Sequence, residues 1–296
     1  MTRALTTMPA AGLLLLLLSG CAAAGAQSAQ PAPSGGPQDK RRLMEAMRTD
    51  CMERKGFKYV QNIPEPRKTS ADEELRSAGD YQAMLKYREK YGFGRFASYV
   101  HPDDPEVRAG STGELVSSPR VQADLRLQRS MSETQRAQWV AANDTCYSDA
   151  IKELTGRTVT GEQDLWRQMG EISRRLRSAE IDGDPELVRL ARDYGDCLRG
   201  RGVRVTSLKP TEIEMSAQSH FEAGLGAVAQ RKDGVKGGVY TPAFSAQEAA
   251  PYLAREVKAA IEDLECGKDF YAAHRPKDNE VSEKVRRELG VSGELL

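Results

Sequence analysis

Four cysteines spread along the chain constrain its fold more than any other feature. Cys51, Cys146, Cys197 and Cys266 all lie beyond residue 50, and a fifth, Cys21, lies in the N-terminal segment. No Cys-x-x-Cys pair occurs and there are only three histidines, so the ligand spacing of a zinc site is absent. An even number of cysteines is typical of a disulfide framework when a chain is exported, which the N-terminal segment described below indicates. We therefore expect two disulfides, with free or metal-bound thiols as the alternative.

An internal repeat selects one of the three possible pairings. Cys51 and Cys197 each precede a glycine by five positions, Gly56 and Gly202, at what reads as the end of a helix. Each half then continues with a helix-start signal, a glycine-containing loop and a second capping box. The matched segments are Ser70–Glu73 with Thr211–Glu214, Gly92–Gly94 with Gly234–Gly238, and Ser132–Gln135 with Ser245–Glu248.

The last helix of each half carries the remaining cysteine. Cys146 and Cys266 each follow a capping box on their helix, and the two sequence separations differ by about two helical turns. Relative to their caps, the two cysteines therefore lie on nearly the same side of the helix. The simplest interpretation is a three-helix unit used twice, with its first helix bonded to its last. The repeat therefore predicts the pairs Cys51–Cys146 and Cys197–Cys266.

The expected fold is mainly α, with two tandem disulfide-braced three-helix units joined by a linking helix and little β structure. The first unit is expected at 40–160, and the linking helix and second unit at 161–296. The clearest apolar stripe runs from Leu253 to Leu264 on one face of a helix. The expected helices are 39–55, 71–91, 133–154, 162–180, 185–199, 212–231, 247–273 and 279–289. Short extended pieces are expected near 57–60, 93–99 and 203–206, and residues 99–131 as a long exposed loop with a short helix after Pro119.

The N-terminal segment is typical of an exported protein. Residues 1–20 contain Arg3 and an apolar run from Ala10 to Leu18. That run is shorter than the about 20 helical residues needed to cross a bilayer, which indicates a signal peptide. Leu18-Ser-Gly-Cys21 resembles the lipobox of bacterial lipoproteins. The resemblance implies cleavage before Cys21, acylation of its thiol with chains such as palmitate, and a lipid anchor on the extracytoplasmic face of the cell membrane.

Residues 21–39 are rich in Ala, Gly, Ser, Gln and Pro and are expected to form a flexible tether. The two Cys-x4-Gly turns, the stretch Tyr91–Gly94 and the late cysteines resemble a group of actinobacterial lipoproteins over most of residues 45–275. This resemblance implies no activity.

The charge balance argues against nucleic acid as a partner. Removal of residues 1–20 leaves 42 basic and 43 acidic residues, so no long-range field attracts polyanions or anionic lipid. Membrane attachment is therefore expected to come from the N-terminal lipid alone.

The sequence contains no recognised catalytic motif, so we assign no catalytic residue, metal or cofactor. The chain lacks the nucleophile elbow, the zinc-protease helix and the phosphate-binding loop. Gly224–Ala229 matches the dinucleotide pattern only in letters, because helical residues precede it. Asp182 and Asp184 are better explained by a turn and an N-cap before Pro185 than by a metal. Each histidine is isolated in sequence from a cysteine or carboxylate, which favours a core or surface role.

An aromatic loop is the candidate binding surface. Its residues are Tyr91, Phe93, Arg95, Phe96 and Tyr99. The neighbouring glycines allow close approach of a ligand, and an arginine can pair with a carboxylate or phosphate. The alternative is that Phe93 and Phe96 pack into the core beneath a turn.

Taken together, these features favour a non-enzymatic binding or structural module of the cell envelope, with an envelope protein or cell-wall component as partner. The alternative is an extracytoplasmic hydrolase-type enzyme whose site is assembled only on folding. A buried carboxylate or histidine beside a cleft would favour the enzyme. A shallow surface without perturbed titratable groups would favour the binding module.

Overall fold

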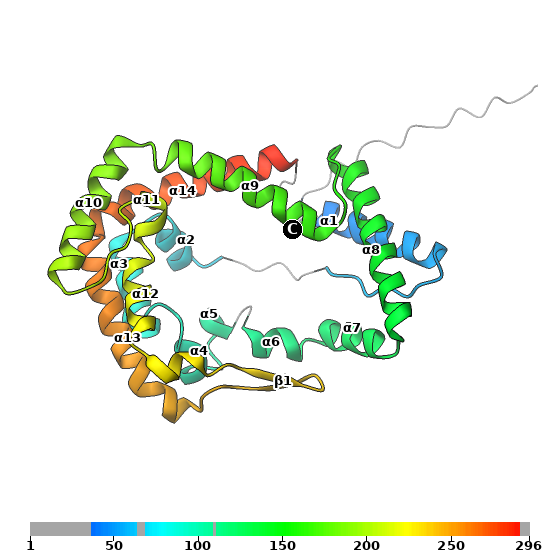
Figure 1. Cartoon of the computed structure of the whole chain (residues 1–296), viewed down its shortest axis with the longest axis horizontal. Coiled ribbons are helices and arrows are strands. Elements are labelled where there is room, and N and C mark those ends of the chain that lie inside the picture. Colours follow the sequence, from blue (N-terminus) through cyan, green and yellow to red (C-terminus); the bar gives the residue numbers. More distant parts are fainter. Residues whose placement is uncertain (1–36, 64–68, 109–110, 291–296) are drawn as a thin grey trace, which may run out of the picture. The chain divides into compact units, whose positions relative to one another are not determined.

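The computed structural model describes residues 37–63, 69–108 and 111–290, and its described part is mainly helical (Figure 1). The predicted signal peptide, Cys21 and most of the tether lie outside these ranges. The helices are α1 (Pro37–Arg54), α2 (Ala71–Ser77), α3 (Tyr81–Tyr91), α4 (Ala97–Val100), α5 (Pro105–Arg108), α6 (Thr112–Ser117), α7 (Pro119–Arg129), α8 (Glu133–Thr155), α9 (Glu162–Glu180), α10 (Pro185–Gly200), α11 (Pro210–Ile213), α12 (Ser216–Ala223), the 3-10 helix η1 (Gly226–Gln230), α13 (Ala246–Cys266) and α14 (Lys268–Leu289). One antiparallel hairpin, β1 (Gly234–Lys236) with β2 (Val239–Thr241), provides the strands of the described residues.

Both predicted disulfides are confirmed. Cys51–Cys146 joins α1 to α8, and Cys197–Cys266 joins α10 to α13, with Cα separations of 5.7 and 5.5 Å. The helix α1 lies alongside α8 (Figure 1). The mainly α, doubly bonded framework expected from the sequence is therefore present.

The two bonded helix ends are built alike. The N–H of Phe57 donates to the carbonyl of Met52 (2.9 Å), and the N–H of Val203 donates to that of Leu198 (3.0 Å). The preceding glycines have φ values of 80° and 79°, the left-handed conformation that ends helices in the Schellman motif. The Cys-x4-Gly pattern therefore encodes the same local structure twice.

A polar contact also recurs one turn before each disulfide. Arg48 lies three residues before its cysteine and donates to Asn143, three residues before the partner cysteine (3.0 Å). At the equivalent positions of the second half, Tyr194 donates to Asp263. The repeat thus extends from the sequence into the packing beside each bond.

The C-terminal helix α14 contributes to two hydrophobic cores. Phe270 and Tyr271, near its start, pack with α10 and α11 residues. Val281 and Val285, near its end, pack with α1, α8 and α9 residues. The predicted linking helix α9 contacts both α8 and α14. Both helices therefore join segments from the two halves of the sequence.

The helix predicted at 71–91 is broken. Gly79 has a φ of +83°, and a Cβ there would lie 2.5 Å from the carbonyl oxygen of Tyr271 on α14. Only glycine permits this approach and this backbone conformation together. Asp80 then caps α3 by accepting from the N–H of Ala83 (2.8 Å).

The prediction for the C-terminus was also wrong in its boundaries. The helix expected at 247–273 ends at Cys266, and α14 runs on without the expected gap between 273 and 279. Gly267 marks the break, because a Cβ there would lie 2.7 Å from the ring of Tyr271. Pro276 lies inside α14, so the helix accommodates a proline within the expected gap.

Three further expectations need correction. The helix expected at 212–231 is divided into α11, α12 and η1, where Gly226 adopts a φ of 55°. The expected loop at 99–131 contains α5, α6 and α7, of which α7 is the helix predicted after Pro119. None of the three expected extended pieces is a strand; the hairpin instead turns at Gly237 and Gly238, both with positive φ, as two-residue hairpins require.

Candidate functional site

A cavity of about 380 Å³ lies among α2, α3, α12 and α14. Its size is within the range of small-molecule sites. We call it the arginine-lined cavity. Its wall includes Arg76, Tyr87, Arg88, Phe93, Glu214, Met215, Tyr271 and Arg275.

Aromatic rings hold the three arginines of this wall. The guanidinium carbon of Arg76 lies 4.1 Å from the ring centroid of Tyr87. Those of Arg88 and Arg275 lie 4.9 and 5.4 Å from the ring centroid of Tyr271. Such stacking fixes each guanidinium plane. Each arginine also has a carboxylate partner: Glu106 for Arg76 (3.1 Å), Asp263 for Arg88 and Glu214 for Arg275 (3.2 Å). The cavity therefore combines apolar surface with oriented donors.

Two residues of the cavity wall, Arg88 and Tyr271, belong to a buried cluster around Asp263. Asp263 accepts hydrogen bonds from Arg88, Tyr194 and Tyr271, and the Tyr271 contact measures 2.7 Å. Burial raises the pKa of Tyr271, and the Asp263 carboxylate raises it further. Burial alone would lower the pKa of Arg88, but the charges of Tyr271 and Asp263 outweigh it and raise that pKa. The cluster is a saturated ion pair suited to holding α3, α10, α13 and α14 together.

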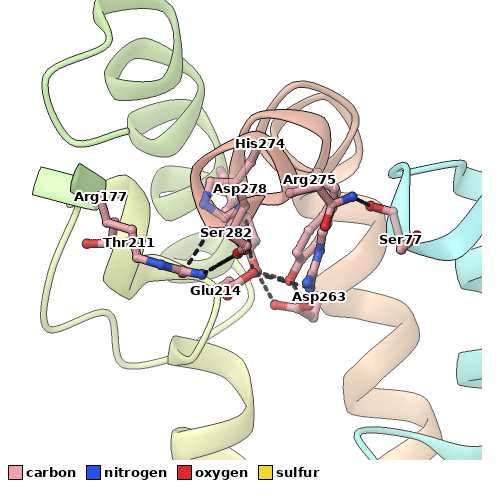
Figure 2. Close-up of polar contacts among 12 residues, drawn as sticks. Ser77, Arg177, Thr211, Glu214, Asp263, His274, Arg275, Asp278 and Ser282 are labelled. Atoms are coloured by element: carbon pink, nitrogen blue, oxygen red, sulfur yellow. Dashed lines mark hydrogen bonds and ion pairs between the residues drawn. The ribbon is translucent and has the colours of Figure 1, made fainter. Parts of the chain in front are cut away.

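His274 lies behind the cavity wall, and it is 1% exposed. Within the described residues, neither ring nitrogen has a hydrogen-bond partner. The ring stacks on Phe270 with centroids 4.8 Å apart, and Nδ1 lies 4.0 Å from Oε2 of Glu214 (Figure 2). Burial lowers the pKa of His274, while the negative charges of Glu214 and Asp278 oppose that shift. The imidazole is therefore neutral near pH 7.

Glu214 connects this histidine to the cavity. Its Oε2 lies 3.2 Å from Nη2 of Arg275, which also lines the cavity (Figure 2). The two side chains are only partly exposed, at 23% and 35%. This carboxylate therefore pairs with Arg275 and lies just beyond hydrogen-bond distance of the histidine.

The predicted aromatic loop lies mostly inside the protein. Phe96 is 0% and Tyr91 6% exposed, and of the five candidate residues only Phe93 lines the arginine-lined cavity. Tyr99 donates to Asp233 (2.7 Å), and the side chain of Arg95 donates to the carbonyl of Ala229 (3.4 Å). This burial favours the alternative in which Phe96 packs in the core.

The loop nevertheless surrounds a carboxylate, that of Glu256 on α13. The backbone N–H groups of Arg95 and Phe96 donate to it at 2.7 and 3.0 Å. A Cβ at Gly92 would lie 2.7 Å from its Cγ, so glycine is needed for the approach. The close approach expected at the glycines therefore occurs, but to a carboxylate of the protein itself, and the backbone N–H of Arg95, not its guanidinium, donates to that carboxylate.

The remaining sequence candidates have structural roles. Asp184 accepts from the N–H groups of Glu186 and Leu187 as the predicted N-cap of α10. Asp182 accepts from Thr211, which therefore does not cap a helix as predicted. Nδ1 of His220 accepts from the N–H of Arg204 (3.3 Å). In the described ranges no group of three His, Cys, Asp or Glu side chains is placed to hold a metal ion.

Sequence reasoning missed the residues that line the arginine-lined cavity. Arg76, Arg88 and Arg275 come from three helices, and nothing in their local sequence separates them from exposed arginines. For His274 a signal existed, because Asp278 follows it by one helical turn. The gap expected between the two C-terminal helices hid that one-turn spacing.

A second hollow of about 580 Å³ is lined mainly by small polar residues and prolines, such as Ser98, Pro102 and Ser118, with Tyr240. It has no buried ionisable group in its wall, so its recognition chemistry is weaker than that of the arginine-lined cavity.

No family model, characterised protein or solved structure matches this chain. Among the helices at 37–63, 69–108 and 111–290, none combines the length and the apolar character needed to span a bilayer.

Proposed function

We propose that this chain is a lipid-anchored protein on the extracytoplasmic face of the cell membrane, where it binds an envelope component through the arginine-lined cavity. The lipobox resemblance at Cys21 supports the anchor. The two disulfides support an oxidising compartment. The observation that carries the binding role is the convergence of three ring-stacked arginines on one cavity.

The polar groups around the cavity favour binding over catalysis. Asp263 is occupied by three donors, and Glu256 by backbone N–H groups. Carboxylates held in this way stabilise the fold and are not available as acids or bases. Arg275, in contrast, has a ring-stacked guanidinium whose Nε lacks a hydrogen-bond partner within the described residues, so it offers an oriented donor to a ligand.

Photo-crosslinking in intact cells tests this role. A photoreactive amino acid replaces Met215, which lines the cavity and is 49% exposed, and a matched control replaces Val140 on α8, which is 46% exposed. We expect a defined envelope component to crosslink at Met215 only, and Arg275→Gln to reduce its yield. Equal crosslinking at both positions would contradict a cavity-specific ligand.

Cys21→Ser in the same strain should release the protein from the membrane fraction; full retention would contradict the lipid anchor.

One observation favours the alternative of a hydrolase-type enzyme. A buried histidine, His274, lies 4.0 Å from Glu214, a partly exposed carboxylate that lines the cavity, and a histidine beside a carboxylate is common at catalytic sites. The two functions differ in what happens to the ligand. An enzyme would return the crosslinking ligand chemically altered after incubation, and His274→Phe would stop the alteration while binding persists. Recovery of the intact ligand supports the binding module.

A further inference from the structure

We propose that the ligand of the arginine-lined cavity carries a carboxylate or phosphate group that takes Arg275 from Glu214, and that Glu214 then pairs with His274, which gains a proton as the ligand binds. This inference rests on the proposed binding role and adds the ligand class and its dependence on pH. It involves no covalent step, and the proton comes from solvent.

Glu214 is placed to exchange partners. Its Oε2 lies 3.2 Å from Nη2 of Arg275 on one side and 4.0 Å from Nδ1 of His274 on the other. The first distance is that of an ion pair, and the second is slightly too long for a hydrogen bond. A small movement of one carboxylate would therefore replace one contact with the other.

Arg275 has unused donor capacity. Its Nε is buried and has no hydrogen-bond partner within the described residues, while its guanidinium lies against the Tyr271 ring. An anion with two oxygens can satisfy adjacent N–H groups of a guanidinium together. The apolar side chains of Phe93 and Met215 in the same wall suit an apolar group next to the anion.

The charges facing His274 come from several elements. Arg177 on α9, Glu214 between α11 and α12, and Arg275 and Asp278 on α14 all act on the imidazole. Asp278 is ion-paired with Arg177 (2.6 Å), and on the α10 side Asp184 is paired with Lys277. Glu214 is thus the carboxylate whose pairing a cavity ligand can change, because its partner Arg275 also lines the cavity.

The sign of the pH effect follows from this exchange. In the free protein Arg275 neutralises Glu214, and burial keeps the pKa of His274 low. When the ligand occupies Arg275, Glu214 is left without that neutralising partner, and its charge raises the pKa of the adjacent imidazole. Between the free-state and bound-state pKa values, binding takes up one proton, so affinity rises by up to about tenfold for each unit that the pH falls.

Calorimetric titration of the folded protein with small probes tests the proposal. N-acetylphenylalanine is the carboxylate probe, phenyl phosphate the phosphate probe, and N-acetylphenylalaninamide the neutral control. Each is titrated at pH 5.5 and 7.5 in two buffers that differ in ionisation enthalpy, which measures proton uptake. We expect the carboxylate probe, whose own group is ionised at both pH values, to bind more tightly at pH 5.5 with proton uptake. Phenyl phosphate itself takes up a proton at about pH 6, so its affinity is compared with that of the carboxylate at pH 7.5, where the ratio distinguishes a carboxylate source from a phosphate source.

Three variants, two of them with a matched control, complete the test. Arg275→Gln should weaken anion binding at least about tenfold, the loss expected for a charge-assisted hydrogen bond, while Arg286→Gln, which pairs with Glu283 outside the cavity, should not. Glu214→Gln should strengthen binding at pH 7.5 by about two- to fivefold, the worth of a partly exposed ion pair, and abolish proton uptake. His274→Phe should abolish proton uptake, and His101→Gln should preserve it. Thermal unfolding of each variant establishes that it is folded.

The outcomes separate this inference from the proposed function. Equal binding of the neutral and anionic probes would overturn the anion inference but retain a ligand-binding cavity. Anion binding without proton uptake, or a wild-type pH dependence in Glu214→Gln, would overturn the exchange of partners. A ligand crosslinked at Met215 that carries no carboxylate or phosphate would overturn the ligand class, whereas absence of any Met215-specific crosslink would overturn the binding role itself.

Discussion

Each disulfide in this protein has a fully buried carboxylate near it: Glu45 beside Cys51–Cys146, and Asp263 beside Cys197–Cys266. Glu45 finds its partners nearby in the chain. It accepts from Arg48 at 2.9 Å, from the hydroxyl of Tyr59 at 2.9 Å and from the N–H of Asn62 at 2.6 Å. The first buried charge is therefore satisfied by residues at most 17 positions away.

Asp263 is satisfied at long range. Its cationic partner Arg88 lies 175 positions away, on α3 in the first half of the sequence. On the same helix as Asp263, Glu256 accepts from the 93–96 loop, again from the first half. The buried carboxylate of the first disulfide region is thus satisfied locally, whereas that of the second is satisfied only when α3 docks on α13. Similar covalent frameworks therefore coexist with different degrees of dependence on the rest of the chain.

Removal of the disulfides should have the largest effect, and it should be nearly equal in the two regions. The loops closed by Cys51–Cys146 and Cys197–Cys266 span 95 and 69 positions. The chain-entropy model gives at most about 4–5 kcal/mol for each, with a difference of only about 0.3 kcal/mol. Paired Cys→Ser variants, compared by urea denaturation, measure both losses. A gap of several kcal/mol between them would show that one bond does more than restrict the unfolded chain.

Substitutions at the equivalent polar positions should separate the two regions. Asp263→Ala leaves Arg88 buried without its counter-charge and should lower the free energy of unfolding by about 3–5 kcal/mol. Asn143→Ala removes one hydrogen bond from Arg48, which keeps its ion pair with Glu45, and should cost only about 1 kcal/mol. Urea denaturation of the two variants measures the difference.

A compensating variant checks the cause. If the loss in Asp263→Ala comes from the unpaired arginine, then replacing both partners, as in Asp263→Leu with Arg88→Met, should recover much of the stability. Equal losses in Asp263→Ala and Asn143→Ala, or no recovery in the double variant, would contradict the contrast between local and long-range satisfaction.

The sequence predicted well the features that neighbouring residues determine. The capping boxes at Ser132 and Ser245 are both formed, and the paired Cys-x4-Gly turns led to the correct disulfides. Turns and caps depend on a few adjacent residues, and covalent pairing was constrained by their repetition. Local information was sufficient for this part of the fold.

The features that the sequence did not reveal depend on contacts between distant segments. Gly79 and Gly267 break helices because another helix approaches there, which no local pattern records. The apolar stripe of α13 omitted Glu256 and Asp263, since carboxylates are seldom buried, yet both are fully buried beside distant donors. The arginine-lined cavity was missed for the same reason: its residues meet only after α2, α3 and α14 pack.

Glu256→Gln tests the second polar contact between α13 and the first half of the sequence, that of Glu256 with the 93–96 loop. The amide would turn an N–H₂ group toward backbone donors, so we expect a loss of about 1–3 kcal/mol at neutral pH. Burial raises the pKa of Glu256 above its ordinary value, so the folded protein binds this proton more readily than the unfolded chain. The wild type should therefore gain stability relative to the variant as the pH falls through the raised pKa toward about 4.3.

Denaturation curves across this pH range measure the effect, with Glu262→Gln as the control. Glu262 lies on the same helix but is 43% exposed at its side chain. A constant difference between wild type and Glu256→Gln at every pH would contradict a raised pKa at this carboxylate, and a loss equal to that of Glu262→Gln would contradict its role in holding the loop.

Replacement of the two capping serines should give the smallest loss of stability, and the loss should be most nearly equal between the two halves of the sequence. Ser132 and Ser245 each accept from the N3 backbone N–H and each receive the reciprocal contact of a capping box. Replacement of either by alanine should lower the free energy of unfolding by about 1 kcal/mol. Both caps are exposed, and neither contacts Glu256 or Asp263, through which α13 binds the first half of the sequence. Equal losses, measured by urea denaturation, would place the asymmetry of the two regions in their buried charges. A markedly larger loss at Ser245 would mean instead that α13 depends on its cap to present Glu256 and Asp263 to α3, and that the difference between the regions begins at the start of the helix.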